Sequence, residues 1–329
     1  MTAANGAYRP PSWLPGGHAQ TIYASLLPRL EVRYRRERVE TPDGDFVDFD
    51  WLETTAGAGT PLIVLFHGLE GSSSSHYARA LMRQVQTMGW RGVVPHFRGC
   101  SGEPNRVPRA YHSGDYSEVG WMLATIRALV PDAPLFAAGV SLGGSALLNW
   151  IGRETPQVPA MLTAAAAIST PLDLTASGLA IDQGLNRIYS RYFLRTLLPK
   201  ALAIAQRFPG RLDEQSIRRA GTMYAFDEVV TAPLHGFAGA EDYWSRASSK
   251  PWLRHIGLPT LVLNARNDPF IPATSLPGPR DVGSGVLLEQ PEDGGHGGFP
   301  AAPFPGRLDW LPTRLVSFFC SVGGIARPG

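Results

Sequence analysis

Serine, aspartate and histidine, the side chains of nucleophilic acyl chemistry, occur in that order along this chain. Ser141 lies in Gly139-Val140-Ser141-Leu142-Gly143, directly after an apolar run and directly before a helix-forming run. The G-x-S-x-G string alone is weak, but a nucleophile elbow requires this setting of strand, tight turn and helix. Small residues are needed two positions before and after the serine, because such a turn brings neighbouring backbone very close. We therefore predict that Ser141 is a nucleophile rather than an ordinary turn residue.

A serine hydroxyl needs a base to remove its proton, and the base needs an acid to orient it. Asp268 follows one apolar run, and His296 lies in a glycine-rich loop after the next. A turn-forming aspartate and a solvated histidine are the alternatives for each residue taken alone. The order serine, aspartate, histidine, with each residue placed after a strand, favours a triad of Ser141, Asp268 and His296. Glu292 and Asp293 are rival acids, but they lie on the same loop as His296, so we prefer Asp268.

Acyl transfer also requires backbone N–H groups that bind the developing oxyanion. We expect one donor to be the N–H of Leu142, the residue after the nucleophile. The other expected donor is the N–H of Leu69, in the loop that follows the early apolar run 62–66. Gly68 permits a sharp turn in this loop. His67 precedes the serine in the chain, so we expect it to support the loop by hydrogen bonding rather than to act as the base.

Apolar runs and helical periodicities alternate along most of the chain, and these elements must position the residues above. Two alternating runs around Pro-Asp-Gly within residues 31–52 predict a hairpin. Strands alternating with helices indicate an α/β fold with a mostly parallel central sheet flanked by helices. The expected strands are 62–66, 92–95, 135–140, 164–169, 261–263 and 286–288, and the expected helices include 76–88, 119–130, 146–151 and 310–320.

The alternation stops at Pro171 and resumes only near residue 253. Residues 172–252 contain helical segments with aromatic residues and no run typical of a strand. We therefore predict a helical cap, residues 172–252, inserted into a core formed by residues 31–171 and 253–329. The first 30 residues are rich in proline and glycine, and we expect them to form an N-terminal arm that wraps the surface.

Composition excludes several classes of function. The 329 residues are 44% hydrophobic and carry a formal net charge of +2, which supports a sizeable core and argues against a nucleic-acid partner. Two cysteines, Cys100 and Cys320, argue against a disulfide framework and fit a reducing compartment. We find no secretory signal and no spanning segment, so we expect a cytoplasmic protein. No metal-ligand or phosphate-loop motif occurs, so we expect neither a metal nor a cofactor.

One segment of the cap carries two side-chain patterns at helical spacing. Packing on the core is the preferred interpretation of the apolar stripe, and a lid over an apolar site is the alternative. Arginines recur every four residues on the same helix. A solvated helix face is the usual explanation of such a pattern, and contact with anionic lipid headgroups is the more specific alternative. The apolar residues are Leu185, Ile188, Tyr189, Tyr192 and Phe193, and the arginines are Arg187, Arg191 and Arg195.

Taken together, segments along nearly the whole chain resemble the YheT-like α/β-hydrolases, the bacterial branch of the group that includes the membrane-associated ABHD lipases of animals. The segments that contain the candidate triad residues are shared by many α/β-hydrolases, whereas GGHAQTI and TAPLHGF are more specific to this group. Some relatives also carry an acyltransferase-like H-x4-D motif. Here Asp115 and Glu118 follow His112 at other spacings, so this chain lacks the motif, which argues against an acyltransferase role. The segments are GGHAQTI (16–22), HGLEGSSSSHY (67–77), FRGCSG (97–102), YHSGD (111–115), GVSLGG (139–144), STPLDL (169–174), TAPLHGF (231–237), ARNDPFIP (265–272) and GGHGGF (294–299).

The resemblance implies an α/β-hydrolase core with a helical cap, carboxylesterase activity, and Ser141, Asp268 and His296 as the triad. We expect a serine carboxylesterase that hydrolyses short-to-medium acyl esters, including monoacylglycerol-like lipids, through an acyl-enzyme. An acyltransferase with the same triad and a non-catalytic binding protein on this scaffold remain the alternatives. The expected partner is a small-molecule acyl ester, with peripheral lipid contact through the cap as a further expectation.

Overall fold

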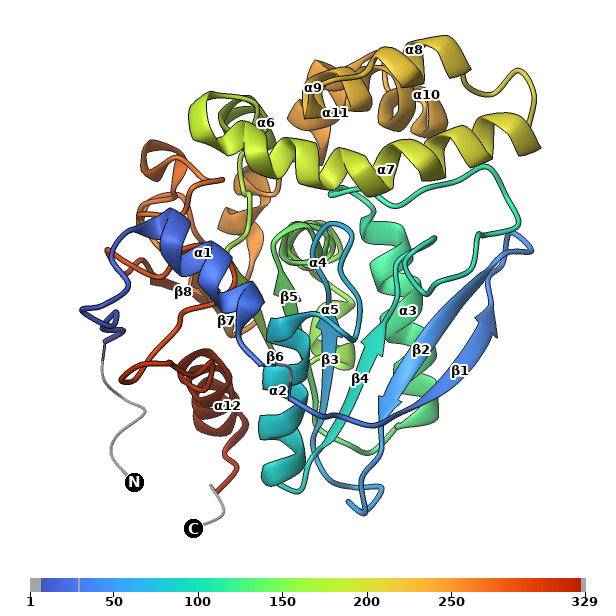
Figure 1. Ribbon diagram of the computed structural model, residues 1–329. Coiled ribbons are helices and arrows are strands. Elements are labelled where there is room, and N and C mark those ends of the chain that lie inside the picture. Colours follow the sequence, from blue (N-terminus) through green and yellow to red (C-terminus); the bar gives the residue numbers. More distant parts are fainter. Residues whose placement is uncertain (1–6, 29, 327–329) are drawn as a thin grey trace.

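Eight strands of the described chain form one sheet, in the order β1-β2-β4-β3-β5-β6-β7-β8. The structure is a computed structural model that describes residues 7–28 and 30–326 (Figure 1). β2 runs antiparallel to both of its neighbours, and the other pairs are parallel, which confirms the predicted, mostly parallel sheet. The strands are β1 Tyr34–Glu40, β2 Phe46–Leu52, β3 Leu62–Phe66, β4 Arg91–Pro95, β5 Leu135–Val140, β6 Ala164–Ile168, β7 Thr260–Leu263 and β8 Val286–Glu289.

The strand register brings the candidate loops to one edge of the sheet. Phe66 at the end of β3 pairs with Gly139 near the end of β5. Ile168 at the end of β6 pairs with Val140 on one side and with Leu263 on the other. Because parallel strands end at the same edge, the loops after β3, β5, β7 and β8 meet there.

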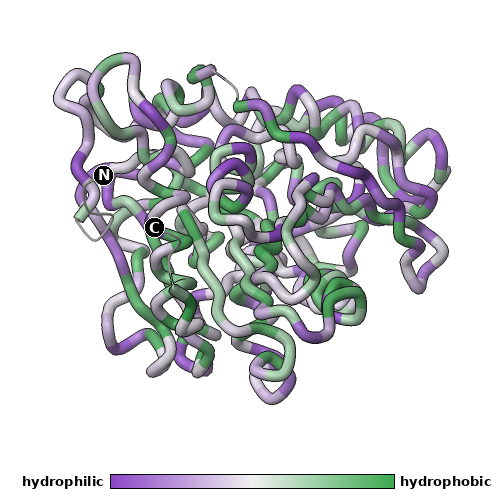
Figure 2. The backbone as a smooth tube through the Cα atoms, turned by 90° about the horizontal axis from the view of Figure 1, so that it is seen from below, coloured by the Kyte–Doolittle hydropathy of each residue, from purple (hydrophilic) through white to green (hydrophobic). Residues whose placement is uncertain are grey.

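Helices cover both faces of the sheet (Figure 1). One apolar core lies between the sheet and α3 and α4, and includes Met122 and Leu147; the other lies against α2 and α12, and includes Leu81 and Phe319. Figure 2 shows hydrophobic and hydrophilic stretches alternating along the backbone. The helices of these layers are α2 His76–Thr87, α3 Tyr116–Leu129, α4 Leu142–Arg153, α5 Val158–Met161 and α12 Trp310–Gly323, with the short η3 Lys250–His255 and η4 Ala273–Ser275 in connecting segments.

The N-terminal segment contains a helix that the sequence did not predict, α1 Gly17–Leu26. Its buried residues are Gln20 and Ala24, so its inner face is not an apolar stripe. The expectation of a simple surface arm was therefore incomplete. The helix packs against the loop that carries His296, where the Thr21 hydroxyl accepts a hydrogen bond from the His296 N–H.

Helices alone connect β6 to β7, and they lie over the carboxyl edge of the sheet (Figure 1). They have an apolar cluster of their own, in which Leu194 and Leu197 pack with Ile217 and Phe226. The division into arm, core and cap stays a prediction. The elements are α6 Leu174–Ile181, η1 Gly184–Asn186, α7 Arg187–Arg207, α8 Glu214–Arg219, α9 Met223–Phe226, η2 Asp227–Thr231, α10 Ala232–His235 and α11 Ala240–Ala247.

The apolar stripe expected to pack on the core is largely exposed. Leu185 in η1 and Ile188 and Tyr192 in α7 face solvent, whereas Tyr189 and Phe193 are partly buried. The preferred packing interpretation is therefore wrong for three of the five residues, because spacing alone does not say which flank of a helix its neighbours cover. None of the described helices has both the length and the apolar character needed to cross a bilayer.

Candidate active site

Ser141 occupies a strained turn between β5 and α4. Its φ is 55° and its ψ is −122°, a region that non-glycine residues rarely adopt. The Ser141 N–H donates to the Ile168 carbonyl at 2.8 Å, which ties the turn to β6. A Cβ at position 143 would lie 2.5 Å from the backbone oxygens of Phe66 and His67, and one at 139 would lie 2.6 Å from the Gly143 oxygen. The two glycines are therefore required by close backbone approach.

Asp268 and His296 form a hydrogen-bonded pair. The His296 Nδ1 lies 2.8 Å from the Asp268 Oδ2, and the aspartate side chain is fully buried. The other carboxylate oxygen, Oδ1, accepts the Phe270 N–H at 2.8 Å. An ionised carboxylate only accepts, so the imidazole proton belongs on Nδ1 and the lone pair on Nε2. This tautomer is the one that a general base needs.

The rival acids lie elsewhere. Asp293 accepts hydrogen bonds from the side-chain amides of Asn267 at 2.7 Å and Gln20 at 3.3 Å. Glu292 is exposed and pairs with Arg266. Neither carboxylate has a hydrogen bond to His296 among the described residues, so the geometry favours Asp268 as the partner of the imidazole.

Ser141 and His296 line one cavity of about 540 Å³. The Ser141 hydroxyl makes no hydrogen bond with any residue that the structure describes, so serine and imidazole share this space without direct bonding. Catalytic hydrogen bonds of hydrolases are often long in the absence of substrate and tighten in the complex. The structure thus brings all three candidate residues to one edge of the sheet and pairs two of them.

Three residues that the sequence did not assign to the site hold the histidine loop. The buried Gln20 accepts the Gly294 N–H through Oε1 at 2.8 Å, and the Thr21 hydroxyl accepts the His296 N–H at 2.9 Å. The Ser169 hydroxyl accepts the Gly297 N–H, also at 2.9 Å. The sequence signals were two segments of the family resemblance, GGHAQTI with Gln20 and Thr21 and STPLDL with Ser169, neither of which indicates this role by itself.

His67 is buried at the start of the candidate oxyanion loop. Its Nδ1 lies 2.8 Å from the Gly68 carbonyl, and its Nε2 accepts the Phe97 N–H at 3.1 Å. Burial lowers the pKa of His67 to about 3, so the ring is neutral near pH 7. A neutral ring that donates through Nδ1 and accepts through Nε2 satisfies both bonds. His67 therefore links this loop to the segment after β4 and has no nitrogen left to act as a base.

The expected donor Leu69 lies between two residues whose backbone N–H groups are hydrogen-bonded to tyrosine hydroxyls. The Gly68 N–H donates to the Tyr77 hydroxyl at 2.8 Å, and the Glu70 N–H donates to the Tyr111 hydroxyl at 2.7 Å. No described residue accepts from the Leu69 N–H. Leu69 lines the same cavity as the serine, so it stays a candidate for the second oxyanion donor.

The second expected donor, Leu142, is the first residue of α4. A backbone N–H at this position has no acceptor within its own helix, and the helix dipole adds partial positive charge. Leu142 also lines the cavity. Both donors named from the sequence therefore border the space in which a substrate carbonyl would meet Ser141.

An ion pair joins the cap to this loop. The Lys200 ammonium group of α7 lies 2.8 Å from the Glu70 Oε1, which also accepts from the Tyr111 hydroxyl at 3.0 Å. Glu70 has a φ of 55°, so its backbone is strained. The Leu69 side chain packs against the cap cluster as well as the sheet core. The position of the Leu69 N–H therefore depends on contacts from α7.

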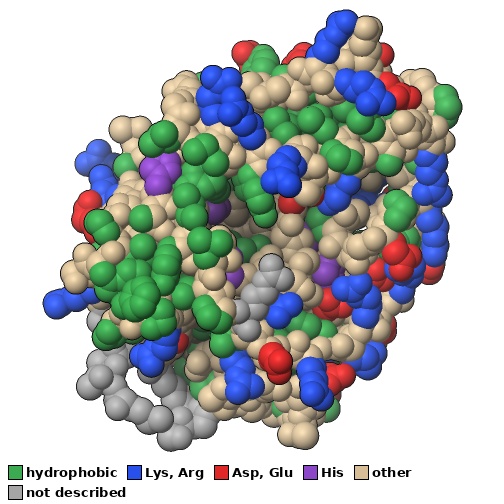
Figure 3. All heavy atoms as spheres, in the orientation of Figure 1, with side chains coloured by type: hydrophobic (Ala, Val, Ile, Leu, Met, Phe, Trp, Pro, Cys, Tyr) green, Lys and Arg blue, Asp and Glu red, His purple; other side chains and the backbone are tan. Residues whose placement is uncertain are grey.

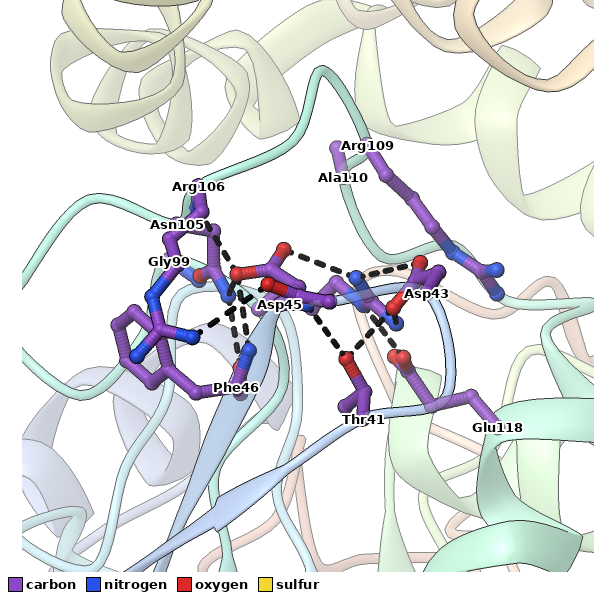
Figure 4. Close-up of polar contacts among 12 residues, drawn as sticks. Thr41, Asp43, Asp45, Phe46, Gly99, Asn105, Arg106, Arg109, Ala110 and Glu118 are labelled. Carbon is purple, nitrogen blue, oxygen red and sulfur yellow. Dashed lines mark hydrogen bonds and ion pairs between the residues drawn. The ribbon is translucent and has the colours of Figure 1, made fainter.

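The cavity runs beneath the cap. Its cap wall is largely apolar, and the face drawn in Figure 3 is hollowed below α7. The opposite wall includes the segment after β4, where the buried Arg98 pairs with Asp45 and Glu118 and holds the segment against the hairpin (Figure 4). Among the described residues, no three or more His, Cys, Asp or Glu side chains are arranged to hold a metal ion. The cap wall includes Phe193, Leu197, Met223, Phe226 and Val230.

Comparisons with known proteins agree with this fold. The family model described as alpha/beta hydrolase fold matches residues 61–303. YheT of Escherichia coli (strain K12), provisionally named an esterase, is 39% identical over 92% of this chain and 92% of its own. Phospholipase ABHD3 of Homo sapiens is 31% identical over 94% of this chain and 78% of its own. An esterase structure from Pyrococcus furiosus shares the fold with a TM-score of 0.56 at 14% identity, covering 89% of this chain and 96% of that one.

Proposed function

The chain belongs to the α/β-hydrolase family and is a hydrolase of the esterase and lipase type, and we propose that it is a serine carboxylesterase with Ser141, His296 and Asp268 as its triad. The observation that carries this proposal is the Asp268–His296 pair on the cavity that also exposes Ser141 at a strained elbow. The two N–H groups of Leu69 and Leu142 support it, because they border the same space.

The reaction divides into two acyl transfers. The Nε2 of His296 takes the proton of Ser141 as the Oγ attacks the ester carbonyl, and Asp268 stabilises the imidazolium. The Leu69 and Leu142 N–H groups bind the oxyanion of the tetrahedral intermediate. The intermediate collapses, the alcohol leaves with the proton from His296, and an acyl-serine ester remains. Water, deprotonated by the same imidazole, then attacks the acyl-enzyme. The second tetrahedral intermediate collapses, His296 returns the proton to the Ser141 Oγ, and the acid leaves.

The substrate class follows from the cavity. Its volume of about 540 Å³ lies within the usual range for sites that enclose small organic ligands. The cavity touches α7 from Phe193 to Arg207, and the 14 helical steps between them rise about 21 Å. A cavity of this volume with a largely apolar lining suits short-to-medium acyl chains and lipid-like esters better than compact polar esters, which lose little by staying in water.

A chain-length series tests the proposal. Purified protein is assayed with p-nitrophenyl acetate, butyrate and octanoate, and the free acid is measured together with p-nitrophenol to separate hydrolysis from transfer. We expect kcat/KM to rise from acetate towards octanoate, and Ser141→Ala to lower kcat by about 10⁴ to 10⁶. Ser145→Ala, which removes another hydroxyl from α4, is the matched control. Wild-type turnover by Ser141→Ala would exclude the mechanism.

A further inference from the structure

Two helices far apart in the sequence share an exposed apolar surface. On the cap, Leu185 is 69% exposed, Ile188 62% and Tyr192 67%; on α1, Ile22 and Leu26 are exposed as well. We call these five residues the α1–α7 surface. Long apolar side chains rarely gather in the open on a monomer unless something covers them.

The two halves of this surface are joined by a direct contact. The His18 Nδ1 of α1 lies 3.1 Å from the Tyr189 hydroxyl of α7, and the two rings are parallel within 2°. His18, Ile22 and Leu26 follow one another at intervals of four, so they lie along one side of α1. In Figure 3, apolar side chains spread over the region of α1 and the start of α7.

The charge on the two helices is one-sided. α7 contains five basic residues and no acidic residue, and α1 contains neither Asp, Glu, Lys nor Arg. Arg187, Arg191 and Arg195 are exposed, and the structure gives them no ion pair with any residue it describes. Exposed arginines without ion-pair partners, set beside exposed apolar side chains, are complementary to an anionic lipid surface.

The surface also borders the candidate active site. The Tyr189 ring centroid lies 4.6 Å from that of Phe270, and the Phe270 ring lies 4.2 Å from the His296 imidazole. Phe193, one turn further along α7, lines the cavity. A layer that covered the α1–α7 surface would therefore lie beside the place where an acyl chain meets the triad.

We propose that the α1–α7 surface docks on an anionic lipid bilayer. Its apolar side chains enter the interface, and Arg187, Arg191 and Arg195 contact the phosphate headgroups. The apolar residues are spread over α1, η1 and α7 and are flanked by long arginine side chains. This arrangement suits a fluid lipid surface better than the fixed surface of a folded protein. Docking beside the cavity shortens the path of a lipid ester from the bilayer to Ser141, although binding itself does not depend on catalysis.

Co-sedimentation with vesicles tests the proposal. Vesicles of phosphatidylcholine alone are compared with vesicles of phosphatidylcholine and phosphatidylglycerol in equal amounts, at low and high ionic strength. We expect binding to the anionic vesicles, weakened by salt, and little binding to the neutral ones. Replacing the three arginines with Gln should weaken binding on the order of 100-fold, since each basic residue near an anionic surface contributes about five-fold.

The apolar part has its own variant and control. Leu185→Ser, Ile188→Ser and Tyr192→Ser combined should abolish binding, whereas Leu129→Ser, at an exposed leucine at the end of α3, should not change it. Thermal unfolding checks that each variant is folded. Absence of binding to the anionic vesicles, or binding that neither set of variants weakens, would overturn the proposal. So would a lipid-free dimer that the triple serine variant converts to a monomer, because a second copy would then be the occupant.

Discussion

Asp268→Asn is the substitution that separates the proposed triad from a simple hydrogen-bonded loop. Asp268 uses Oδ1 to accept the Phe270 N–H and Oδ2 to accept the Nδ1–H of His296. Asparagine has the same shape but one oxygen and one NH₂ group. The buried Phe270 N–H needs an acceptor, so the asparagine oxygen takes that place and the NH₂ group faces His296. The ring then has to accept at Nδ1 and carry its proton on Nε2.

A ring protonated on Nε2 cannot accept the Ser141 proton. The expected loss in kcat is therefore about 10⁴, the effect of imposing the wrong tautomer in a serine hydrolase. KM should change little, because Asp268 contacts the imidazole and not the acyl chain. The cost in stability should be small, since both hydrogen-bond positions stay occupied.

Steady-state hydrolysis of p-nitrophenyl butyrate measures the effect, and Asp293→Asn is the matched control. Asp293 is the rival acid on the loop of His296, and its oxygen Oδ1 accepts from the amides of Asn267 and Gln20 instead. We expect the control to retain kcat within about ten-fold. Near-normal turnover by Asp268→Asn, or an equal loss in Asp293→Asn, would refute the assignment of the acid.

Three further predictions concern groups that position the triad and the oxyanion loop. Lys200→Met should lower kcat about ten-fold with little change in KM, because it removes the ion pair that holds Glu70 beside the Leu69 N–H. Lys200→Arg, which keeps the charge, should restore much of the rate. Equal rates in the wild type and both variants would contradict a role of this ion pair in catalysis. Gln20→Ala should lower the free energy of unfolding, measured with urea, by about 1–3 kcal/mol and also lower kcat, because the Gly294 N–H loses its buried acceptor. An unchanged unfolding midpoint and an unchanged kcat would contradict this role of Gln20. The folded-state pKa of His67 is lowered from 6.5 to about 3, so below about pH 6.5 the unfolded chain binds one more proton than the folded one, and this group lowers the free energy of unfolding by about 1.4 kcal/mol per pH unit as the pH falls. His67→Gln should remove that part of the pH dependence, measured by urea unfolding at pH 7 and pH 5. An identical pH dependence in the variant would count against a neutral buried ring.

The sheet could be read from the sequence because its strands are short apolar runs separated by helical periodicities. Strands and helices alternate from Leu62 to Ile168, and the structure reproduces the predicted elements with shifted ends and adds one short helix, α5, before β6. The sequence did not predict helix α1 because its buried residues are Gln20 and Ala24, which form no apolar pattern of helical period. Tertiary hydrogen bonds, not hydrophobic patterning, hold that helix in place.

The site shows the same division. Chain order alone could name Ser141, Asp268 and His296, since each follows a strand whose end lies at one edge of a parallel sheet. The sequence favours Asp268 over Asp293 because Asp268 follows a separate strand, and the 2.8 Å contact with His296, which no spacing rule fixes, supports that preference. The pairing of Lys200 with Glu70 joins residues 130 positions apart on different layers, so only the folded chain reveals it.

Covalent labelling tests whether Ser141 is the nucleophile. The protein is incubated with a fluorophosphonate, and the modified residue is identified by intact mass and peptide mass spectrometry, alongside Ser141→Ala and Asp268→Asn. We expect one adduct, on Ser141, absent from Ser141→Ala and formed much more slowly in Asp268→Asn. An active wild-type enzyme that carries no adduct on Ser141, or carries it on another residue, would contradict the proposed mechanism.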